Sequence, residues 1–395
     1  MKEMTVTLMR SDLYASPAYT GAYLRLPANQ NGIQDAMERA RITADQPYKI
    51  VECYNNQGES IEYIPENPPL NELNFLAFRL SEMEDWQEIA FIGLVKMEKE
   101  LPSIQTLINI TYNMDNVQCV PVKNDTELGE FYLDNEFIDV VNEIPDECRE
   151  EILKFIDPEK VGRFMREAEN GAYVDGHYVV KDFDELKQVY DGMHLPEQPK
   201  ETDYIFNLLL ESGVDDLKNN RGQWLSFPAS PKQINEALHY LKTASLDDCI
   251  IERSESIISR FDNNFTFLED IDKISVLADR VRKLQSQDAL PKYKAILEFT
   301  DCADIDHALD LTKNLDCYDF YPQMSSPEEY GRQALLKDSS LKPDDPAFQY
   351  VEFDSYGRAM MERDSATNTE YGFVRRNENE MKLEYCRPSI GQQMM

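Results

Sequence analysis

One segment of this chain occurs twice in similar form, 201 residues apart, and the spacing of the two copies indicates the size of the folding unit. The stretch Gly-Ala-Tyr-Leu-Arg-Leu-Pro-Ala from Gly21 corresponds to Gly-Gln-Trp-Leu-Ser-Phe-Pro-Ala from Gly222. At this offset six residues of the first copy meet identical residues in the second: Gly21, Leu24, Pro27, Ala28, Ile33 and Ala36. The period is far longer than that of a solenoid repeat, so it predicts a tandem duplication of a whole domain.

The matching blocks keep the same order along both halves of the chain. Residues 76–80 align with residues 277–281, and after a deletion, at an offset of 195, residues 161–163 align with residues 356–358. Convergence of short motifs would not readily preserve this order. We therefore predict one unit over residues 1–200 and a second over residues 201–383, joined near a polar, proline-containing stretch. Residues 384–395 are expected to form a flexible tail.

Each predicted unit has an α+β pattern, with a small α/β part, a helical middle part and a C-terminal α/β part. In the first part, strands are expected at residues 5–9 and 49–54, and at residues 204–210 and 249–253, with a further strand ending at each shared proline. The intervening helices have the apolar spacing of one buried face, at Ile33, Ala36, Met37 and Ala40 and at Ile234, Ala237, Leu238 and Leu241.

The later parts of each unit follow the same scheme. The helical middle is expected to begin near Leu70 and Leu268. The third part should end in a helix and a short extended stretch, at residues 176–180 and 371–375. Asp157 before Pro158 predicts a helix start, and Asp354 is placed to serve near the same turn. The Gly-Arg pairs of these helices are interpreted chiefly as packing positions, with a binding site as the alternative.

The charge of the chain is its most unusual property. Asp and Glu total 74 against 40 Lys and Arg, which gives a formal net charge of −34. The acids are unevenly placed, because residues 1–50 hold 5 acids and 6 bases, whereas residues 51–150 hold 22 acids and 5 bases. Such a field repels nucleic acids and membranes and favours basic partners. At the charge density of duplex DNA, the net charge matches about 58 Å of duplex.

The densest acidic segment is residues 125–159, interrupted only by Arg149 and Lys154. We predict that it forms most of a partner-binding face, with a thinner contribution from the second half. The alternative for any single carboxylate is a solvated helix surface. The predicted face comprises Asp125, Glu127, Glu130, Asp134, Glu136, Asp139, Glu143, Asp146, Glu147, Glu150, Glu151, Asp304, Asp306, Asp310, Glu328 and Glu329.

A basic segment interrupts the second half, at Arg280, Arg282, Lys283, Lys292 and Lys294. Two interpretations stay open for it. The cations would pair with an acidic face of the other copy or of a second chain, or they would form ordinary i,i+4 surface pairs.

Other classes of protein find little support. The chain has no phosphate-binding loop, nucleophile elbow, dinucleotide fingerprint or His-Glu-x-x-His motif. Its seven cysteines lack the spacing of a disulfide framework or zinc site, and no apolar run is long enough for a membrane span. We expect no catalytic residues, no metal and no cofactor.

The opening strand, loop and Gly-Ala-Tyr-Leu-Arg-Leu-Pro stretch, followed by a helix, resembles the ArdA family of antirestriction proteins. The stretch from Tyr350 to Arg358 is similar to the family's tyrosine, acid and Tyr-Gly-Arg pattern, through Tyr350, Asp354, Tyr356, Gly357 and Arg358. These motifs are short, but the resemblance covers most of both halves.

The resemblance implies an elongated, acidic α+β fold that mimics bent B-form DNA. It implies an inhibitor that occupies the DNA-binding cleft of a type I restriction–modification enzyme in the cytoplasm of a bacterial host. Such proteins are encoded by phages, plasmids or conjugative elements, and they commonly dimerise through the C-terminal part. An acidic module directed at another DNA-binding defence complex, such as a CRISPR effector, or at a nucleoid protein is the alternative.

This chain departs from the family pattern by being doubled. It is therefore expected to form either a homodimer or an intramolecular pseudo-dimer in which the second unit replaces a partner chain. The first copy's version of the terminal motif, residues 155–163, lacks the tyrosines. This loss puts its role in pairing in doubt.

Overall fold

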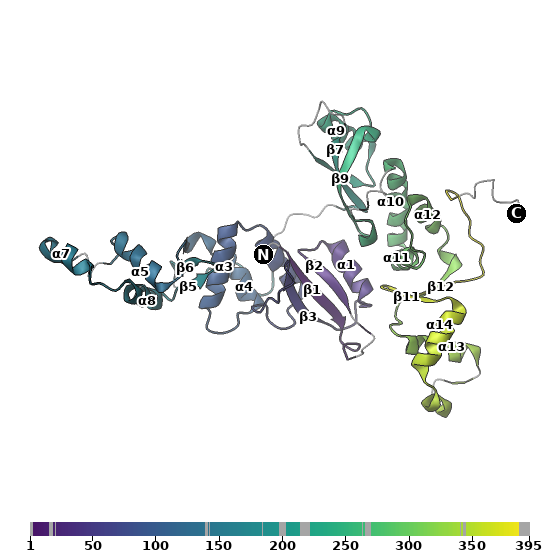
Figure 1. The fold of residues 1–395 in the computed structure, drawn as a ribbon. Helices are drawn as coiled ribbons and strands as arrows, with labels where there is room; N and C mark the ends of the chain where they lie inside the picture. Colours follow the sequence, from purple (N-terminus) through teal and green to yellow (C-terminus); the bar gives the residue numbers. More distant parts are fainter. Residues whose placement is uncertain are drawn as a thin grey trace. The chain divides into compact units, whose positions relative to one another are not determined.

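The computed structural model places helices and small sheets along the whole chain (Figure 1). Within the described residues it contains four three-stranded sheets, and this confirms the α+β fold class. The structure describes residues 3–15, 19, 21–138, 141, 143–183, 185–196, 203–213, 222–262, 264, 270–339, 341–342 and 345–386.

The first part of each half is a three-stranded sheet with one helix. The first sheet has the order β2-β1-β3 and the corresponding sheet has the order β8-β7-β9. The elements are β1 (Met4–Arg10), β2 (Ala22–Leu26), α1 (Gln30–Arg39) and β3 (Tyr48–Asn55), then β7 (Phe206–Ser212), β8 (Gln223–Phe227), α9 (Pro231–Leu241) and β9 (Cys249–Ser256). Every strand and helix predicted for these parts is therefore present.

Local sequence explains the boundaries of these helices. Asn29 precedes α1, and its side chain accepts a hydrogen bond from the backbone N–H of Gly32. Ser230 precedes α9 and forms a capping box with Gln233. Such caps satisfy N–H groups that have no partner inside the helix.

The middle part of each half is helical, as predicted. It comprises α2 (Leu70–Ser81), α3 (Asp85–Met97) and α4 (Ile104–Ile110), and then α10 (Ile271–Ser286), α11 (Leu290–Phe299) and α12 (Ile305–Leu311). The start predicted near Leu70 is confirmed. Helix α10 begins after Asp270, whose side chain caps it, and Leu268 lies outside the described residues.

The third part of each half combines a short sheet with a helix pair. The sheets have the orders β4-β6-β5 and β10-β12-β11. The elements are η1 (Met114–Asn116), β4 (Val117–Val120), α5 (Asp125–Asp134), α7 (Asp146–Leu153), α8 (Pro158–Glu169), β5 (Ala172–Val174) and β6 (His177–Lys181), then η5 (Leu315–Cys317), β10 (Tyr318–Tyr321), α13 (Pro327–Asp338), η6 (Pro346–Tyr350), α14 (Phe353–Asp364), β11 (Thr367–Thr369) and β12 (Gly372–Arg376).

The two predicted helix starts of the third parts have different outcomes. Asp157 caps α8 by accepting a hydrogen bond from the N–H of Glu159, and Pro158 occupies the first turn. Helix α14 begins at Phe353 after Glu352, and no side chain caps it. Asp354 instead lies in the first turn and pairs with Arg358 at 2.9 Å. The capping role suggested for Asp354 is therefore wrong.

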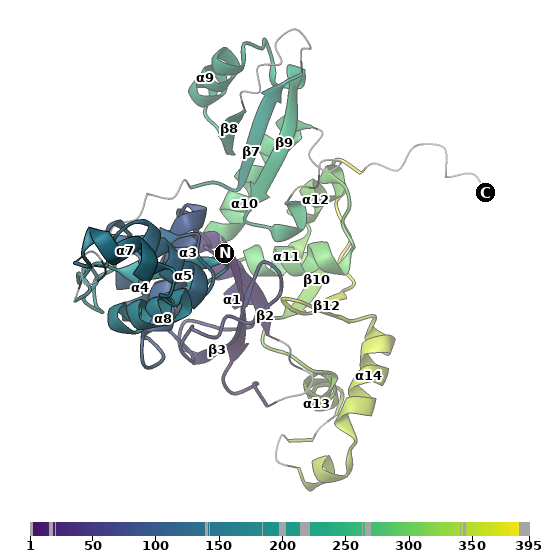
Figure 2. The ribbon, with the colours of Figure 1, turned by 60° about the vertical axis from the view of Figure 1, so that its left-hand side comes forward.

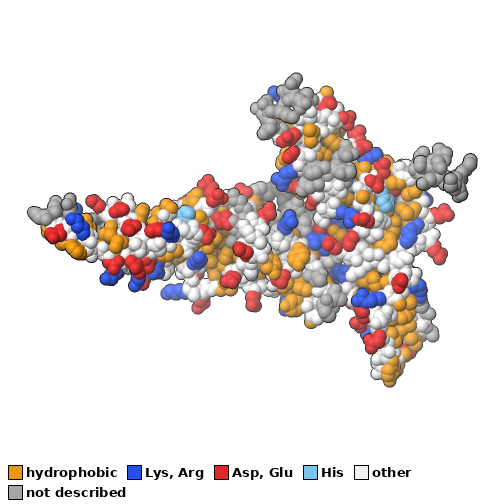
Figure 3. Space-filling model, viewed as in Figure 1, with side chains coloured by type: hydrophobic (Ala, Val, Ile, Leu, Met, Phe, Trp, Pro, Cys, Tyr) orange, Lys and Arg blue, Asp and Glu red, His pale blue; other side chains and the backbone are white. Residues whose placement is uncertain are grey.

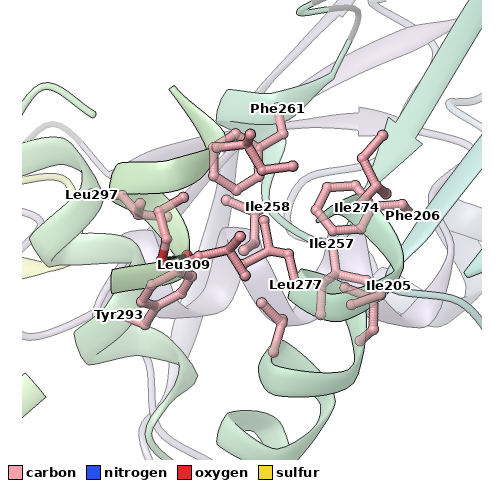
Figure 4. Close-up of a cluster of buried hydrophobic side chains, with 14 of the residues drawn as sticks. Ile205, Phe206, Ile257, Ile258, Phe261, Ile274, Leu277, Tyr293, Leu297 and Leu309 are labelled. Atoms are coloured by element: carbon pink, nitrogen blue, oxygen red, sulfur yellow. Dashed lines mark hydrogen bonds between the residues drawn. The ribbon is translucent and has the colours of Figure 1, made fainter. Parts of the chain in front are cut away.

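One continuous hydrophobic core joins the first sheet of the second half to its helices. Phe206 from β7 stacks with Phe261 of η4 (Ser259–Phe261), and both are fully buried. Ile274 and Leu277 of α10 and Tyr293 of α11 enter the same cluster (Figure 4). The burial of this apolar surface is the main favourable contribution to folding of this region.

The chain divides into two compact units that differ from a simple cut at residue 200. The first unit contains residues 1–7, 23–28 and 49–199, and the second contains residues 8–22, 29–48 and 200–395. Helix α1 therefore belongs to the second unit. Figure 2 shows this helix near α11, which is part of the same unit.

The predicted tail at residues 384–395 begins with anchored residues. The carboxylate of Asp310 accepts hydrogen bonds from the backbone N–H groups of Glu384, Tyr385 and Cys386, at 2.8 to 3.2 Å. Residues 387–395 lie outside the described residues. The start of the segment is thus fixed to α12 rather than free.

Candidate functional site

The densest acidic segment begins with α5, and the backbone of this helix touches that of α8. A Cβ atom on Gly129 of α5 would lie 1.8 Å from the carbonyl oxygen of Pro158, and one on Gly162 of α8 would lie 1.8 Å from that of Asp125. Only glycine fits at both positions. The packing interpretation of the Gly162-Arg163 pair is thereby confirmed, and the close crossing leaves the outer faces of α5 and α8 for other contacts.

Five of the predicted acidic side chains on this segment are exposed to solvent. They are Glu130, Asp134, Glu136, Glu143 and Glu151. Apart from Glu136, none of them forms an ion pair or side-chain hydrogen bond with another described residue. Their negative charge is thus not neutralised locally, and it is available to a basic partner.

Two further predicted acids have internal partners. Asp125 accepts a hydrogen bond from Arg166 at 2.7 Å and another from the hydroxyl of Tyr173 at 2.9 Å. The hydrogen bond from Arg166 is the main cause that lowers the pKa of Asp125. Glu127 pairs with Lys123 at 3.0 Å, and this contact lowers its pKa. Asp125 therefore fastens α5 to α8. The charge of Glu127 is only partly available to a basic partner, because Lys123 neutralises part of it.

Four predicted acids of the segment cannot be placed on this face. Asp139 lies outside the described residues. Asp146, Glu147 and Glu150 belong to α7, but the structure does not describe their side chains.

Large hydrophobic side chains that were not predicted as site residues accompany the exposed acids. Phe155 is 84% exposed and Phe164 is 69% exposed, and Phe137 is also exposed. Over α5, α7 and α8, the visible surface mixes acidic, basic and hydrophobic side chains (Figure 3). The available signal was Phe155 with Ile156, two apolar residues in the short connection between α7 and α8. Exposed apolar groups of this size favour contact with a protein surface.

In the second half, the corresponding acids are mostly occupied in the fold. Glu328 pairs with Arg332 at 2.9 Å along α13. Asp304 caps α12 through the N–H of His307, and Asp306 lies 2.6 Å from Lys273. Glu329 accepts a hydrogen bond from the N–H of Ser325 at 2.6 Å. Asp306 and Glu328 are thus neutralised by cations, whereas Asp304 and Glu329 keep their charge but are held by backbone N–H groups.

Asp310 does not belong to an exposed acidic face. Its side chain is buried, with a residue exposure of 1%, and it holds the backbone of residues 384–386. The prediction that placed it on the partner-binding face is wrong, because composition does not distinguish a surface acid from a buried acceptor.

The family-motif residues of the second half have separate roles. Gly357 provides close packing, because a Cβ there would lie 1.7 Å from the carbonyl oxygen of Pro327. Arg358 pairs with Asp354, and this contact raises the pKa of Arg358. Tyr356 is half-buried, and Tyr350 is 82% exposed. The motif therefore builds a helix pair and presents one aromatic side chain outward.

The basic segment of the second half is mostly paired within the second unit. Lys294 bonds to Asp35 at 2.7 Å and to Glu38 at 3.0 Å. Arg280 donates to the carbonyl oxygen of Leu309, and Arg282 pairs with Asp203. For Lys294, the partners are thus acids of the other half of the chain rather than i,i+4 neighbours.

A metal site and a membrane-spanning helix are both absent from the described residues. Among the described residues, no group of three or more His, Cys, Asp or Glu side chains is arranged to hold a metal ion. No helix in the described ranges is long and apolar enough to cross a bilayer. The seven cysteines are all free thiols.

Comparison with known proteins gives one match. Residues 219–375 match the family model described as antirestriction protein (ArdA). A search of curated proteins found no match. The matched range covers the second half from its β8 strand to β12.

Proposed function

We propose that this chain is an antirestriction protein of the ArdA family that acts by mimicking DNA, because residues 219–375 match the model of that family. Its target is the DNA-binding cleft of a type I restriction–modification enzyme. The binding face is the acidic surface carried by α5 and the segment that follows it to residue 159.

One observation carries this proposal. Glu130, Asp134, Glu143 and Glu151 are exposed acids without an ion-pair partner in the described part of the chain. A DNA-binding cleft is lined with cations that normally neutralise phosphates. A rigid array of carboxylates can occupy the same cations and release the same counterions. Binding of this kind excludes DNA without any covalent step, so the proposal assigns no catalytic residue and no cofactor.

We propose in addition that the chain is a tandem duplication of an ArdA unit. Buried polar residues with matching roles support it. Asn109 accepts hydrogen bonds from the N–H groups of Val189 and Tyr190, and Asp310, 201 residues later, holds the equivalent segment. Asn113 and Asn314 likewise bond to the backbones of Lys187 and Lys382.

The two halves of the chain are proposed to have different functions. The first half provides most of the target-binding charge, and the second half replaces a partner chain, which makes the molecule an intramolecular pseudo-dimer. Contacts between residues 29–48 and the second half, such as Lys294 with Asp35, support this assignment. The proposed target places the protein in the cytoplasm of the host cell.

The test compares two charge-neutralised variants of the full chain. The first variant carries Glu130→Gln, Asp134→Asn, Glu136→Gln, Glu143→Gln and Glu151→Gln. The control carries five exposed changes of the second half: Asp279→Asn, Glu352→Gln, Glu362→Gln, Glu378→Gln and Glu380→Gln. Both lose the same charge, so a general effect of net charge would weaken them equally.

Inhibition of DNA cleavage by a purified type I enzyme is the readout. We expect the first variant to inhibit at least about tenfold more weakly, since fewer counterions are released on binding, and the control to stay close to the wild type. Equal inhibition by both variants would contradict the assigned face. If the wild type inhibits no type I enzyme but co-purifies with another DNA-binding defence complex, such as a CRISPR effector, or with a nucleoid protein, the target is that protein.

A further inference from the structure

Residues of the second unit line an open-sided cavity of about 760 Å³. Its walls are α1 with the turn that follows it, the corner between α10 and α11, residues 320–323 and Tyr371. This volume lies within the usual range for small-molecule sites. The acidic segment belongs to the first unit, and none of its residues lines this cavity.

Arg41 is a buried cation in the wall of this cavity. It lines the cavity, it is only 7% exposed, and its backbone has a positive φ of 56° directly after α1. One terminal nitrogen, Nη2, donates to the side chain of Asn368 and to the carbonyl oxygen of Thr369. The Nε atom is buried without a hydrogen-bond partner. Within the described residues, no carboxylate forms an ion pair with this guanidinium.

A buried guanidinium without a counter-charge is costly, because desolvation of an ion is repaid only by close pairing. The other buried cation on the wall does not share this deficit. Lys294 is compensated by Asp35 and Glu38, and Asp35 also accepts a hydrogen bond from Tyr371. Arg41 thus lacks a contacting counter-ion among the described residues, and the carboxylates of Glu298 and Glu329 act on it only from a distance. The lining acids Glu38 and Asp288 form no ion pair with it either.

Neutral donors line the same cavity. Gln323 accepts a hydrogen bond from Arg10 through its Oε1 atom at 2.9 Å, so its amide N–H group is left to donate. The hydroxyl group of Tyr48 forms no hydrogen bond with a described residue. Met37, Ile42, Leu290 and Phe320 supply apolar wall. An unpaired cation, neutral donors and an apolar wall together match an anionic head with an apolar body.

We propose that this cavity binds a small organic anion, whose carboxylate or phosphate group accepts hydrogen bonds from Arg41 and whose body packs against the apolar wall. The cavity is lined both by residues 31–48 and by residues 257–371, so an occupant holds these two parts of the second unit together. This inference does not depend on the proposed antirestriction function.

Isothermal titration calorimetry on the full chain tests the proposal with benzoate as the probe. Benzamide, a neutral molecule of nearly the same shape, serves as the control ligand. We expect benzoate to bind with a Kd of about 1 mM or tighter and to raise the melting temperature by mass action. Benzamide should bind at least about tenfold more weakly, since it cannot neutralise Arg41.

Two variants separate the site from non-specific binding. Arg41→Gln should reduce benzoate affinity at least about tenfold. Tyr48→Phe keeps the aromatic ring but removes the hydroxyl donor, and it should reduce the affinity for benzoate about threefold to tenfold. It tests the site if Arg41→Gln does not fold. Arg253→Gln, at an exposed arginine of β9, should leave affinity unchanged. No benzoate binding to the wild type, equal binding of benzamide, or unchanged affinity in both Arg41→Gln and Tyr48→Phe would overturn the proposal.

Discussion

The Nζ atom of Lys294 lies 2.7 Å from the Oδ1 atom of Asp35, and both side chains are almost completely buried. The two residues are far apart in sequence but belong to the same compact unit. Burial raises the pKa of Asp35, but the charge and hydrogen bond of Lys294, together with Arg39, outweigh it, so the pKa lies below its ordinary value. The ion pair therefore fastens α1 to α11.

Removing the cation of this pair should destabilise the second unit strongly. Lys294→Met leaves the carboxylate of Glu38 without its cation and that of Asp35 with Arg39 alone. We expect a loss of about 3 kcal/mol or more in the free energy of unfolding. Chemical denaturation followed by circular dichroism measures it. Lys283→Met, at an exposed lysine of α10, is the control. A loss below about 1 kcal/mol would show that the pair does not hold α1 in place.

The glycine crossing between α5 and α8 makes a second prediction. Gly162→Ala introduces a Cβ into the carbonyl group of Asp125, and separating the helices should cost about 1 to 3 kcal/mol. Glu167→Ala, on the exposed side of the same helix, introduces no clash and should be nearly neutral. Thermal unfolding measures the stability of both variants against the wild type. Equal stability of Gly162→Ala and Glu167→Ala would mean that α5 and α8 do not cross so closely.

The pH dependence of stability should include a contribution from Asp262. Burial raises its pKa to about 7, and the nearby acids Glu255 and Asp35 add to this effect. The unfolded carboxyl loses its proton near pH 4, whereas the folded one keeps it to about pH 7. The unfolded state thus binds fewer protons in this window, so the contribution of Asp262 to stability falls as the pH rises.

Asp262→Asn removes this titration while keeping an acceptor for the N–H of Ser256, which bonds to the wild-type carboxylate at 2.6 Å. The stability of the variant relative to the wild type should therefore rise between about pH 4 and about pH 7 and then stay level. Urea denaturation at several pH values measures the difference. A constant difference across the window would contradict the raised pKa.

Asp310 should tolerate one substitution and not another. Asp310→Asn keeps one acceptor oxygen for the N–H groups of Glu384 and Tyr385, as Asn109 accepts from two N–H groups in the first half, but it loses the acceptor for the N–H of Cys386. Asp310→Ala removes the acceptor and should cost about 1 to 3 kcal/mol. Neither change should weaken target binding directly. Hydrogen exchange of the amides of residues 384 and 385 would rise in the alanine variant alone. Unchanged exchange there would show that this carboxylate is not the anchor.

The sequence predicted those features that depend on neighbouring residues. The spacing of Ile33, Ala36, Met37 and Ala40 was sufficient to place α1, and Asp157 before Pro158 was sufficient to place the start of α8. The glycine of each Gly-Arg pair was correctly interpreted as a packing position. These features follow from periodicity, capping and backbone sterics, which act over a few residues.

Features that depend on distant partners were not predictable in the same way. Nothing near Asp35 distinguishes it from a surface acid, because its partner Lys294 is brought to it only by the fold. Asp310 was assigned to the acidic face for the same reason. The exposure of Phe155 and Phe164 was also missed, since a hydrophobic side chain is normally assigned to the core.

The central claim is that this chain occupies the site that DNA uses on a restriction–modification enzyme. The most direct test is competition between the chain and a labelled duplex for a purified type I enzyme, measured by fluorescence anisotropy at several salt concentrations. We expect the chain to displace the duplex completely and its affinity to fall steeply as salt rises. A ternary complex that retains the duplex, or an affinity unaffected by salt, would contradict the claim.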